Sequence, residues 1–384
     1  MEEDAVSAVA ASAIAVKRLT VTDFRCFTRI VLGLDSRPVA LFGPNGAGKT
    51  SLLEALSMVT PGRGLRAAPL ADLRRRSAPP GARWGVAVEV DGYGGPVSLG
   101  AGAAAQGSAR RALRIDGQAA RGQAALAEVV SALWLTPAMD RLFVDGASSR
   151  RRFFDRLVFG FDPSHATRLG VYERSLRERA RLLRDRQGDA AWLSALEARM
   201  AENGVAVAAA RRTTLRRLAP LVSAGVGPFP GAAMSFHGGV EAMLDRMPAL
   251  EAEAELSETL AASRDHDGRA GGARVGAHRC DFAVTPGASG VPAAQCSSGE
   301  QKMLLIAVIL AAARLQATLR GTAPLLLLDE VAAHLDGDHR AALFGEIADM
   351  GAQAWLTGVD RSIFAGFGDA AQYIAVAAGT VTPH

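Results

Sequence analysis

The segment GPNGAGKT, Gly43–Thr50, constrains the fold more than any other part of the chain. It matches the P-loop pattern G-x-x-x-x-G-K-[ST], whose glycines let successive backbone N–H groups point at phosphate oxygens. The apolar run Val39–Phe42 predicts a buried strand before it, and Ser51–Met58 predicts a helix after it. A chance match in a chain with 41 glycines is the alternative, and the flanking strand and helix argue against it.

The P-loop residues predict a site for a nucleoside triphosphate. Lys49 is a compact charge that fits between the β- and γ-phosphates, where a planar guanidinium fits poorly. The chain has three lysines and 40 arginines, so a lysine at this position has a chemical reason. The hydroxyl of Thr50 can bind Mg²⁺. The residues expected to bind ATP are Gly43, Pro44, Asn45, Gly46, Ala47, Gly48, Lys49, Thr50 and Ser51.

The run PLLLLDE, Pro324–Glu330, predicts the second part of the same site. Four leucines indicate a buried strand that ends at Asp329, and α/β sheets bind ligands at the carboxyl ends of their strands. We expect Asp329 to hold Mg²⁺ and Glu330 to be the general base that polarises the attacking water, so that Glu330 and Lys49 are the catalytic residues. A strand that ends in a solvated acidic turn is the alternative.

The segment CSSGEQK, Cys296–Lys302, is a second polar turn, and the apolar run Met303–Ala313 follows it. A serine hydroxyl and a glycine N–H at a helix N-terminus can bind an anion, although a plain capped helix would look the same. The order of P-loop, polar turn and acidic strand resembles that of the ABC-type ATPases. In a head-to-tail homodimer, Ser297 and Gly299 would close over the γ-phosphate held by the other copy. The resemblance also places Asp336 in a D-loop and Thr357 at a switch position.

The length and composition predict two lobes. A chain of 384 residues with 49% hydrophobic content is long for one domain. We expect a flexible N-terminal extension over residues 1–15, an α/β ATPase lobe over 16–118 and 265–384, and an inserted, mainly helical lobe over 119–264. Residues 82–115 alternate like an antiparallel sheet, 260–277 are typical of a mobile loop, and 353–357 predict a further strand. No long heptad array occurs, so no long coiled coil is expected.

Three further features bear on location. The cysteines Cys26, Cys280 and Cys296 are scattered, so the sequence indicates neither a disulfide framework nor a zinc site. The N-terminus begins with acidic residues, unlike a secretory signal. The run Met303–Ala313 is too short to span a bilayer and predicts a buried helix.

The basic residues are concentrated in the predicted helical lobe. Residues 141–217 contain 17 arginines and nine acidic residues, a net charge of +8, whereas the whole chain has +4. Such a surface favours salt-sensitive binding to nucleic acid, and solvated helix faces are the alternative. The residues expected to contact DNA are Arg63, Arg66, Arg150, Arg151 and Arg152.

The chain resembles the bacterial RecF family from about residue 16 to its end. The segments that carry the resemblance are LTVTDFRCF, GPNGAGKTSLLEAL followed by GRGLR, LTPAMDRLFVDGASSRRRFFDRLVF, VGAHRCDF, CSSGEQK and LLLLDEVAAHLD. The chain departs from the family at four positions. Glu300 stands where Gln is usual and Cys296 where Leu is common. Ala277 and Cys280, on either side of His278 and Arg279, stand where Pro and Asp are expected.

The resemblance implies a fold and a function. RecF proteins resemble the heads of SMC-type ATPases, and they bind DNA at gaps and single-strand/double-strand junctions in an ATP-dependent way. The implied partners are RecO and RecR, which load RecA in repair, replication restart and the SOS response. The cofactors are ATP and Mg²⁺, and a slow, DNA-stimulated ATPase would release a dimeric clamp. A cytoplasmic, nucleoid-associated protein without a membrane partner is expected.

Two other functions share the ATP motifs. A transporter-type ATPase subunit would couple to a membrane partner, but the insert between the P-loop and the turn Cys296–Lys302, the signature turn, is far longer than such subunits usually carry. A P-loop kinase needs no signature turn, so a kinase would tolerate replacement of Ser297.

Overall fold

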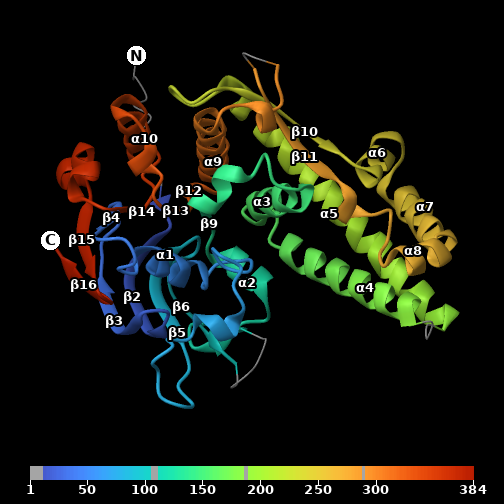
Figure 1. Cartoon of the computed structure of the whole chain (residues 1–384), viewed down its shortest axis with the longest axis horizontal. Coiled ribbons are helices and arrows are strands. Elements are labelled where there is room, and N and C mark those ends of the chain that lie inside the picture. Colours follow the sequence, from blue (N-terminus) through green and yellow to red (C-terminus); the bar gives the residue numbers. More distant parts are fainter. Residues whose placement is uncertain (1–11, 105–110, 186–188, 288–289) are drawn as a thin grey trace, which may run out of the picture. The chain divides into compact units, whose positions relative to one another are not determined.

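The computed structural model describes residues 12–104, 111–185, 189–287 and 290–384, and it divides the chain into two compact units (Figure 1). The first unit comprises the chain up to Ala120, Glu128–Pro137 and Ala312–His384. The second unit comprises Arg121–Ala127 and Ala138–Ala311. The fold is α/β with a mainly helical insertion, as predicted.

A six-stranded sheet of order β16-β15-β4-β14-β13-β9 forms one layer of the first unit. All its neighbours pair in parallel except β15 and β16. The leucines of β13 and all residues of β14 are buried, which explains why these strands read as continuous apolar runs. The strands are β4 (Val39–Phe42), β9 (Ala132–Leu135), β13 (Leu325–Leu328), β14 (Ala354–Gly358), β15 (Gln372–Ala377) and β16 (Thr380–Pro383).

A second six-stranded sheet, of order β3-β2-β5-β6-β7-β8, is antiparallel throughout. Val86, Val88 and Val90 of β5 are buried while Ala87 and Glu89 are exposed, so the alternating sequence marks one buried face. The strands are β2 (Ala15–Phe24), β3 (Phe27–Gly33), β5 (Gly85–Gly92), β6 (Gly95–Ala103), β7 (Arg111–Ile115) and β8 (Gln118–Ala119).

Helices complete the first unit. They are α1 (Lys49–Ser57), α10 (Gly337–Asp349) and the short 3₁₀ segments η1 (Leu70–Leu73), η5 (Ala332–His334) and η6 (Arg361–Ala370). In addition, β1 (Ser12–Ala13) pairs in parallel with β12 (Thr322–Ala323). We expected a flexible extension over residues 1–15, but residues 12, 13 and 15 belong to strands, so ordered structure begins earlier than expected. Residues 1–11 lie outside the described part of the chain.

The second unit consists of helices and a two-stranded antiparallel ribbon. Its core includes Tyr172, Met200, Val205, Val240 and Leu256. Its elements are α3 (Ala147–Phe159), α4 (His165–Asp185), α5 (Ala190–Ala224), β10 (Ala232–His237), α6 (Gly239–Arg246), α7 (Ala249–Ala262), α8 (Arg264–Ala270), η3 (Ala277–Arg279), β11 (Asp281–Pro286) and η4 (Ala293–Gln295). Three elements cross a division between the units: α2 (Gln123–Val129), η2 (Pro137–Arg141) and α9 (Ser298–Arg320).

The second unit differs from the predicted insert at both ends. Within the predicted helical range 119–264, β9 is a strand of the parallel sheet in the first unit. Its four residues are all buried, and periodicity cannot separate a short buried strand from a buried helix. At the other end, residues 265–311 group with the second unit, because β11 pairs with β10 and α8 packs on α4.

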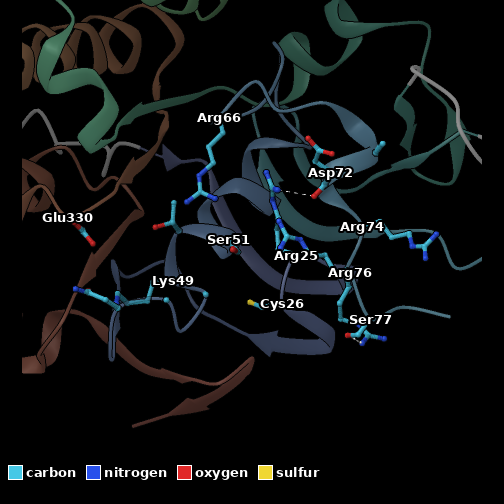
Figure 2. A pocket seen from close by; sticks show the side chains of 16 residues that line it. Arg25, Cys26, Lys49, Ser51, Arg66, Asp72, Arg74, Arg76, Ser77 and Glu330 are labelled. Carbon is cyan, nitrogen blue, oxygen red and sulfur yellow. Dashed lines mark hydrogen bonds between the residues drawn. The ribbon is translucent and has the colours of Figure 1, made fainter. Parts of the chain in front are cut away.

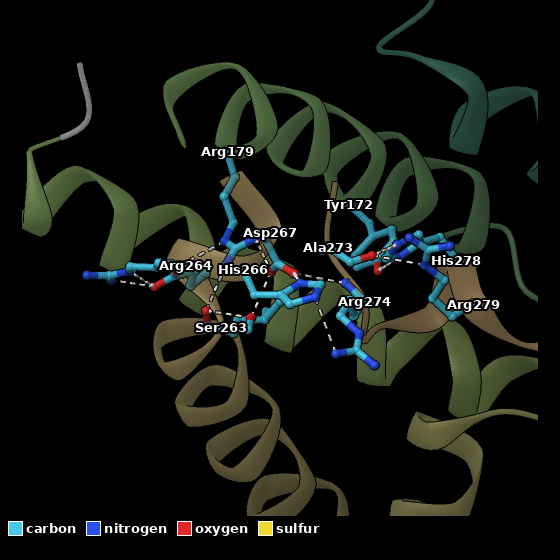
Figure 3. Close-up of polar contacts among 12 residues, drawn as sticks. Tyr172, Arg179, Ser263, Arg264, His266, Asp267, Ala273, Arg274, His278 and Arg279 are labelled. Carbon is cyan, nitrogen blue, oxygen red and sulfur yellow. Dashed lines mark hydrogen bonds and ion pairs between the residues drawn. The ribbon is translucent and has the colours of Figure 1, made fainter. Parts of the chain in front are cut away.

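The predicted mobile loop over 260–277 is wrong, since it contains the end of α7, the helix α8 and part of η3. Figure 3 shows the reason. The guanidinium of Arg179, 1% exposed, donates to Glu197 and to Asp267 of α8, each at 2.8 Å. A buried ion pair between distant segments leaves no trace in local composition, which here is rich in glycine and polar residues.

The same view shows the hydrogen-bond partners of His278 and Arg279, two residues whose role the sequence left open. His278 Nε2 donates to Ala273 O at 3.0 Å, so its Nδ1 accepts the hydroxyl of Tyr172 at 2.6 Å. Arg279 Nε donates to the same carbonyl at 2.9 Å. Both residues therefore tie η3 to the preceding loop, and His278 also ties it to α4.

The helix α9 has 23 residues, so it is longer than the apolar run that predicted it, and by length and composition it could cross a membrane. Of its most apolar window, 67% is buried inside the protein. Ile306, Val308 and Leu310 are each at most 1% exposed, so α9 is a core helix, as predicted.

Candidate nucleotide-binding site

The P-loop lies between β4 and α1, as its sequence predicts, and its glycines are required by geometry. Gly43 has φ +145°, and a Cβ there would lie 2.1 Å from the carbonyl oxygen of Val376. Gly48 has φ +114°, and a Cβ there would lie 2.7 Å from Cys26 Sγ. Larger residues at these positions would therefore distort the turn that presents backbone N–H groups.

Lys49 lies at the first turn of α1 and is 5% exposed. Its Nζ donates to the carbonyl oxygens of Gly43 at 2.7 Å and Pro44 at 3.0 Å. Burial lowers the pKa of Lys49, while the neighbouring Glu330 and Asp329 act in the opposite direction. The ammonium group is thus folded over the turn in which phosphates would bind.

Asp329, at the end of β13, is the centre of a short hydrogen-bond chain. Its Oδ1 accepts the hydroxyls of Thr50 at 2.9 Å and of Thr357 at 2.8 Å. The backbone N–H of Glu330 donates to the oxygen of Thr357 at 2.8 Å. Burial raises the pKa of Asp329. Two converging oxygens of this kind fit a hard cation such as Mg²⁺.

A cavity of about 960 Å³ opens over these residues (Figure 2). Figure 2 shows Lys49 and Glu330 towards one end, Arg74, Arg76 and Ser77 towards the other, and Ser51, Cys26 and Arg25 between them. Glu330 adopts φ +56°, a left-handed conformation that is rare outside glycine. The P-loop residues that line the cavity are Asn45, Gly46, Gly48, Lys49, Thr50 and Ser51.

The sequence missed the part of the cavity wall that lies beyond the P-loop. It consists of Arg25, Cys26, Ala71, Asp72, Arg74, Arg75, Arg76 and Ser77. The run Arg74–Arg76 is a visible charge cluster, but nothing local places it on the wall of the cavity that the P-loop also lines. That placement depends on pairing between distant segments, such as the ion pair of Arg75 with Asp23 at 2.9 Å.

The signature turn belongs to the second unit. Ser297 and Gly299 are exposed, and the hydroxyl and N–H of Ser297 both donate to Glu300 Oε2, at 2.7 and 2.8 Å. Asp336 is exposed and caps α10 by accepting the N–H of His339 at 2.9 Å.

The five arginines expected to contact DNA differ in availability. Arg150 forms a bidentate pair with Asp281, at 2.7 and 2.9 Å, and Arg151 donates to the carbonyl of Cys280. Both guanidinium groups therefore have hydrogen-bond partners within the second unit, and their contact with DNA stays a prediction. Arg152 is exposed and donates to Ser149. Arg63 and Arg66 are also exposed, and Arg66 lies 3.7 Å from Glu54.

Known proteins resemble this chain over most of its length. The family model "RecF/RecN/SMC N terminal domain" matches residues 15–377. The DNA replication and repair protein RecF of Mesorhizobium japonicum is 44% identical over 371 residues, 96% of this chain and 97% of that protein. RecF of Caulobacter sp. (strain K31) is 48% identical over 366 residues, 91% and 93% of the two chains.

Solved structures agree on the fold. The structure of the recombination mediator protein RecF with ATP, in the RecFOR pathway, matches 98% of this chain and 100% of that chain, with a TM-score of 0.83 and 19% identity. An Smc head bound to the C-terminal winged-helix domain of ScpA matches 96% and 97%, with a TM-score of 0.55 and 14% identity. The described residues form this head fold without a long coiled coil. The chain belongs to the RecF family of DNA replication and repair proteins, within the class of SMC- and ABC-type ATPase heads.

Proposed function

We propose that this chain is an ATP-dependent DNA-binding protein of recombinational repair and replication restart. In this proposal ATP drives a homodimer that clamps gapped or junction DNA, and slow, DNA-stimulated hydrolysis releases it. The observation that carries the proposal is the chain of hydrogen bonds from Thr50 and Thr357 to Asp329 beside a P-loop cavity. Membership of the RecF family supports the assignment to DNA repair.

The nucleotide site is proposed to work through its own residues. Residues 43–51 would hold the phosphates of ATP, with Lys49 as the positive charge. Thr50 and Asp329 would hold Mg²⁺, which supplies electrostatic stabilisation of the phosphates when bound. Glu330 would accept a proton from the attacking water. Thr357 would couple Asp329 and Glu330, because its hydroxyl bonds to both.

A homodimer is proposed because the signature turn, a second candidate anion site, is separate from the P-loop in the sequence. Ser297 and Gly299 of one copy would contact the γ-phosphate bound by the other, and Asp336 would reach the opposing site. The exposure of all three residues is consistent with a contact between copies.

The partners and location follow from the family. A similar solved structure is named for the RecFOR pathway, which supports RecO and RecR as partners in loading RecA. A cytoplasmic, nucleoid-associated location follows from a role on DNA. A transporter ATPase subunit is not favoured, because relatives named for DNA repair cover more than nine-tenths of the chain.

The test is sedimentation of the Glu330→Gln variant with and without ATP and Mg²⁺, and then with gapped duplex DNA. The variant should bind ATP but hydrolyse it poorly. We expect an ATP-dependent dimer that captures the DNA, and loss of both on Ser297→Arg. A monomer under every condition would contradict the clamp.

A further inference from the structure

The turn between β2 and β3 is held in a strained backbone conformation. Asp23 has φ +45° and Arg25 has φ +53°, left-handed values that strain the backbone of a residue other than glycine. The turn is fixed from outside, since Arg25 N donates to Leu73 O and Arg75 N donates to Asp23 O, both at 2.7 Å. Strained non-glycine residues cluster at functional sites, so the side chains that this turn presents are candidates for function.

Glu54 fixes the guanidinium of Arg25. It lies on α1, five residues after Lys49, and its side chain is 1% exposed. Arg25 Nε donates to Glu54 Oε2 at 2.7 Å, and Nη2 donates to Oε1 at 2.6 Å. Arg25 Nη1 donates to the carbonyl of Asp72 at 2.9 Å. Three hydrogen bonds therefore set the plane of a cation whose pKa the hydrogen bond to Glu54 raises.

Arg25 lies on the wall of the cavity, beyond the end of the P-loop (Figure 2). Its side chain remains 21% exposed, so the guanidinium is accessible from the cavity. The described residues that line the cavity include no aromatic side chain. A nucleotide base has flat aromatic faces, and a planar guanidinium stacks on such faces.

We propose that Glu54 is a positioning residue that holds the guanidinium of Arg25 as the surface on which the base of the bound nucleotide stacks. This inference rests on the proposed nucleotide site. Two simpler arrangements compete with it. Arg25 could contact the phosphates, or the Glu54–Arg25 pair could only attach α1 to the turn.

The test compares ATP with inorganic tripolyphosphate, which has the phosphates but no base. Dissociation constants are measured by calorimetry with Mg²⁺, using Glu330→Gln as the parent. We expect Arg25→Ala to weaken ATP binding roughly tenfold and to change tripolyphosphate binding by less than about twofold. Arg25→Lys should behave like Arg25→Ala, because lysine has no planar group on which a base can stack, although it keeps the positive charge. Glu54→Gln should weaken ATP binding several-fold, since the amide cannot accept both N–H groups of Arg25.

Arg37→Ala is the matched control. Arg37 also forms a bidentate pair with Asp35, in which Nε donates to Oδ1 at 3.1 Å and Nη2 donates to Oδ2 at 2.7 Å, but it is not among the residues lining the cavity. It should leave the binding of both ligands unchanged.

Each other outcome has a distinct meaning. An equal loss of ATP and tripolyphosphate affinity in Arg25→Ala would identify a phosphate contact and overturn the inference. Unchanged binding with a lower melting temperature would identify a purely structural pair and would also overturn it. Failure of the Glu330→Gln parent to bind either ligand would refute the proposed nucleotide site itself, and the inference would fall with it.

Discussion

Thr357 joins the two acidic residues of the candidate site through one hydroxyl group. It donates to Asp329 and accepts from the backbone of Glu330, so its loss should misplace both. We predict that Thr357→Val lowers the rate of ATP hydrolysis by roughly 10- to 100-fold and changes ATP affinity little. Steady-state kinetics separate the two effects. Thr357→Ser, which keeps the hydroxyl, should retain most activity, and equal activity of Val and Ser variants would contradict the prediction.

Glu300 accepts hydrogen bonds from the two donors of the signature turn, on Ser297, that a phosphate would need. Its carboxylate accepts both the hydroxyl and the N–H of Ser297, and Ser297 in turn lowers its pKa. We predict that Glu300→Gln, a neutral cap, strengthens ATP-dependent dimerisation about fivefold in the Glu330→Gln background. Sedimentation equilibrium measures this. Glu251→Gln removes a charge from the first turn of α7 and should have no effect; a weaker dimer in Glu300→Gln would count against the prediction.

The residues of the nucleotide site divide into those the sequence can place and those it cannot. Lys49, Thr50, Asp329 and Glu330 stand in patterns whose spacing already implies the chemistry. Glu54 lies in an ordinary helical run, LLEAL, and its role becomes visible only through Arg25, which reaches it from the turn between β2 and β3. Pairing between distant segments carries no local signal.

At the scale of elements, η3 depends on a neutral histidine. Burial lowers the pKa of His278 to about 4, and the charges of Arg279 and Arg151 act in the same direction, while the hydrogen bond to Ala273 and the charge of Asp267 oppose them. The unfolded chain, with a pKa near 6.5, binds the proton first, so stability falls as the pH drops from 6.5 towards 4. We predict a loss of up to about 3 kcal/mol in the free energy of unfolding of the second unit over this range.

Urea denaturation at pH 7 and pH 5 checks this prediction. In His278→Gln the difference between the two pH values should shrink, because the titrating group is gone. His266→Gln replaces an exposed histidine of the same unit and should leave the difference as it is. An unchanged difference in His278→Gln would show that other groups cause the acid sensitivity.

Elements whose hydrophobic residues follow a clear pattern, or whose ends are marked by turn residues, were predictable from the sequence, and the others were not. The alternation of β5 and the apolar runs of β13 and β14 each identify a strand. The strand β9 was missed because four buried residues fit either a strand or a helix. The helix α8 was missed because Asp267 is held by Arg179, 88 positions away in the sequence.

At the scale of the whole molecule, charge is unevenly shared. Arg179 and Arg211, at most 2% exposed, are paired with buried carboxylates and cannot reach a phosphate. The arginines of α4 that remain exposed are spaced three, four and three residues apart, on one face of the helix. They are Arg174, Arg177, Arg181 and Arg184. Arg177 and Arg184 have acidic neighbours at 3.7 and 3.6 Å, and such exposed pairs are weak enough for phosphates to replace them.

We predict that these four α4 arginines contact the DNA backbone. Replacing all four by Gln should weaken binding of gapped duplex and lower the slope of log K against log salt by roughly 0.9 for each phosphate that is no longer neutralised. Fluorescence anisotropy at several salt concentrations, with ATP and Mg²⁺, measures both. A control with Arg18, Arg29, Arg37 and Arg83 replaced by Gln removes the same charge from exposed positions of the first unit. If affinity and slope fall equally in the two quadruple variants, only net charge matters. If they fall further in the α4 variant, this helix face is the one that meets the phosphates.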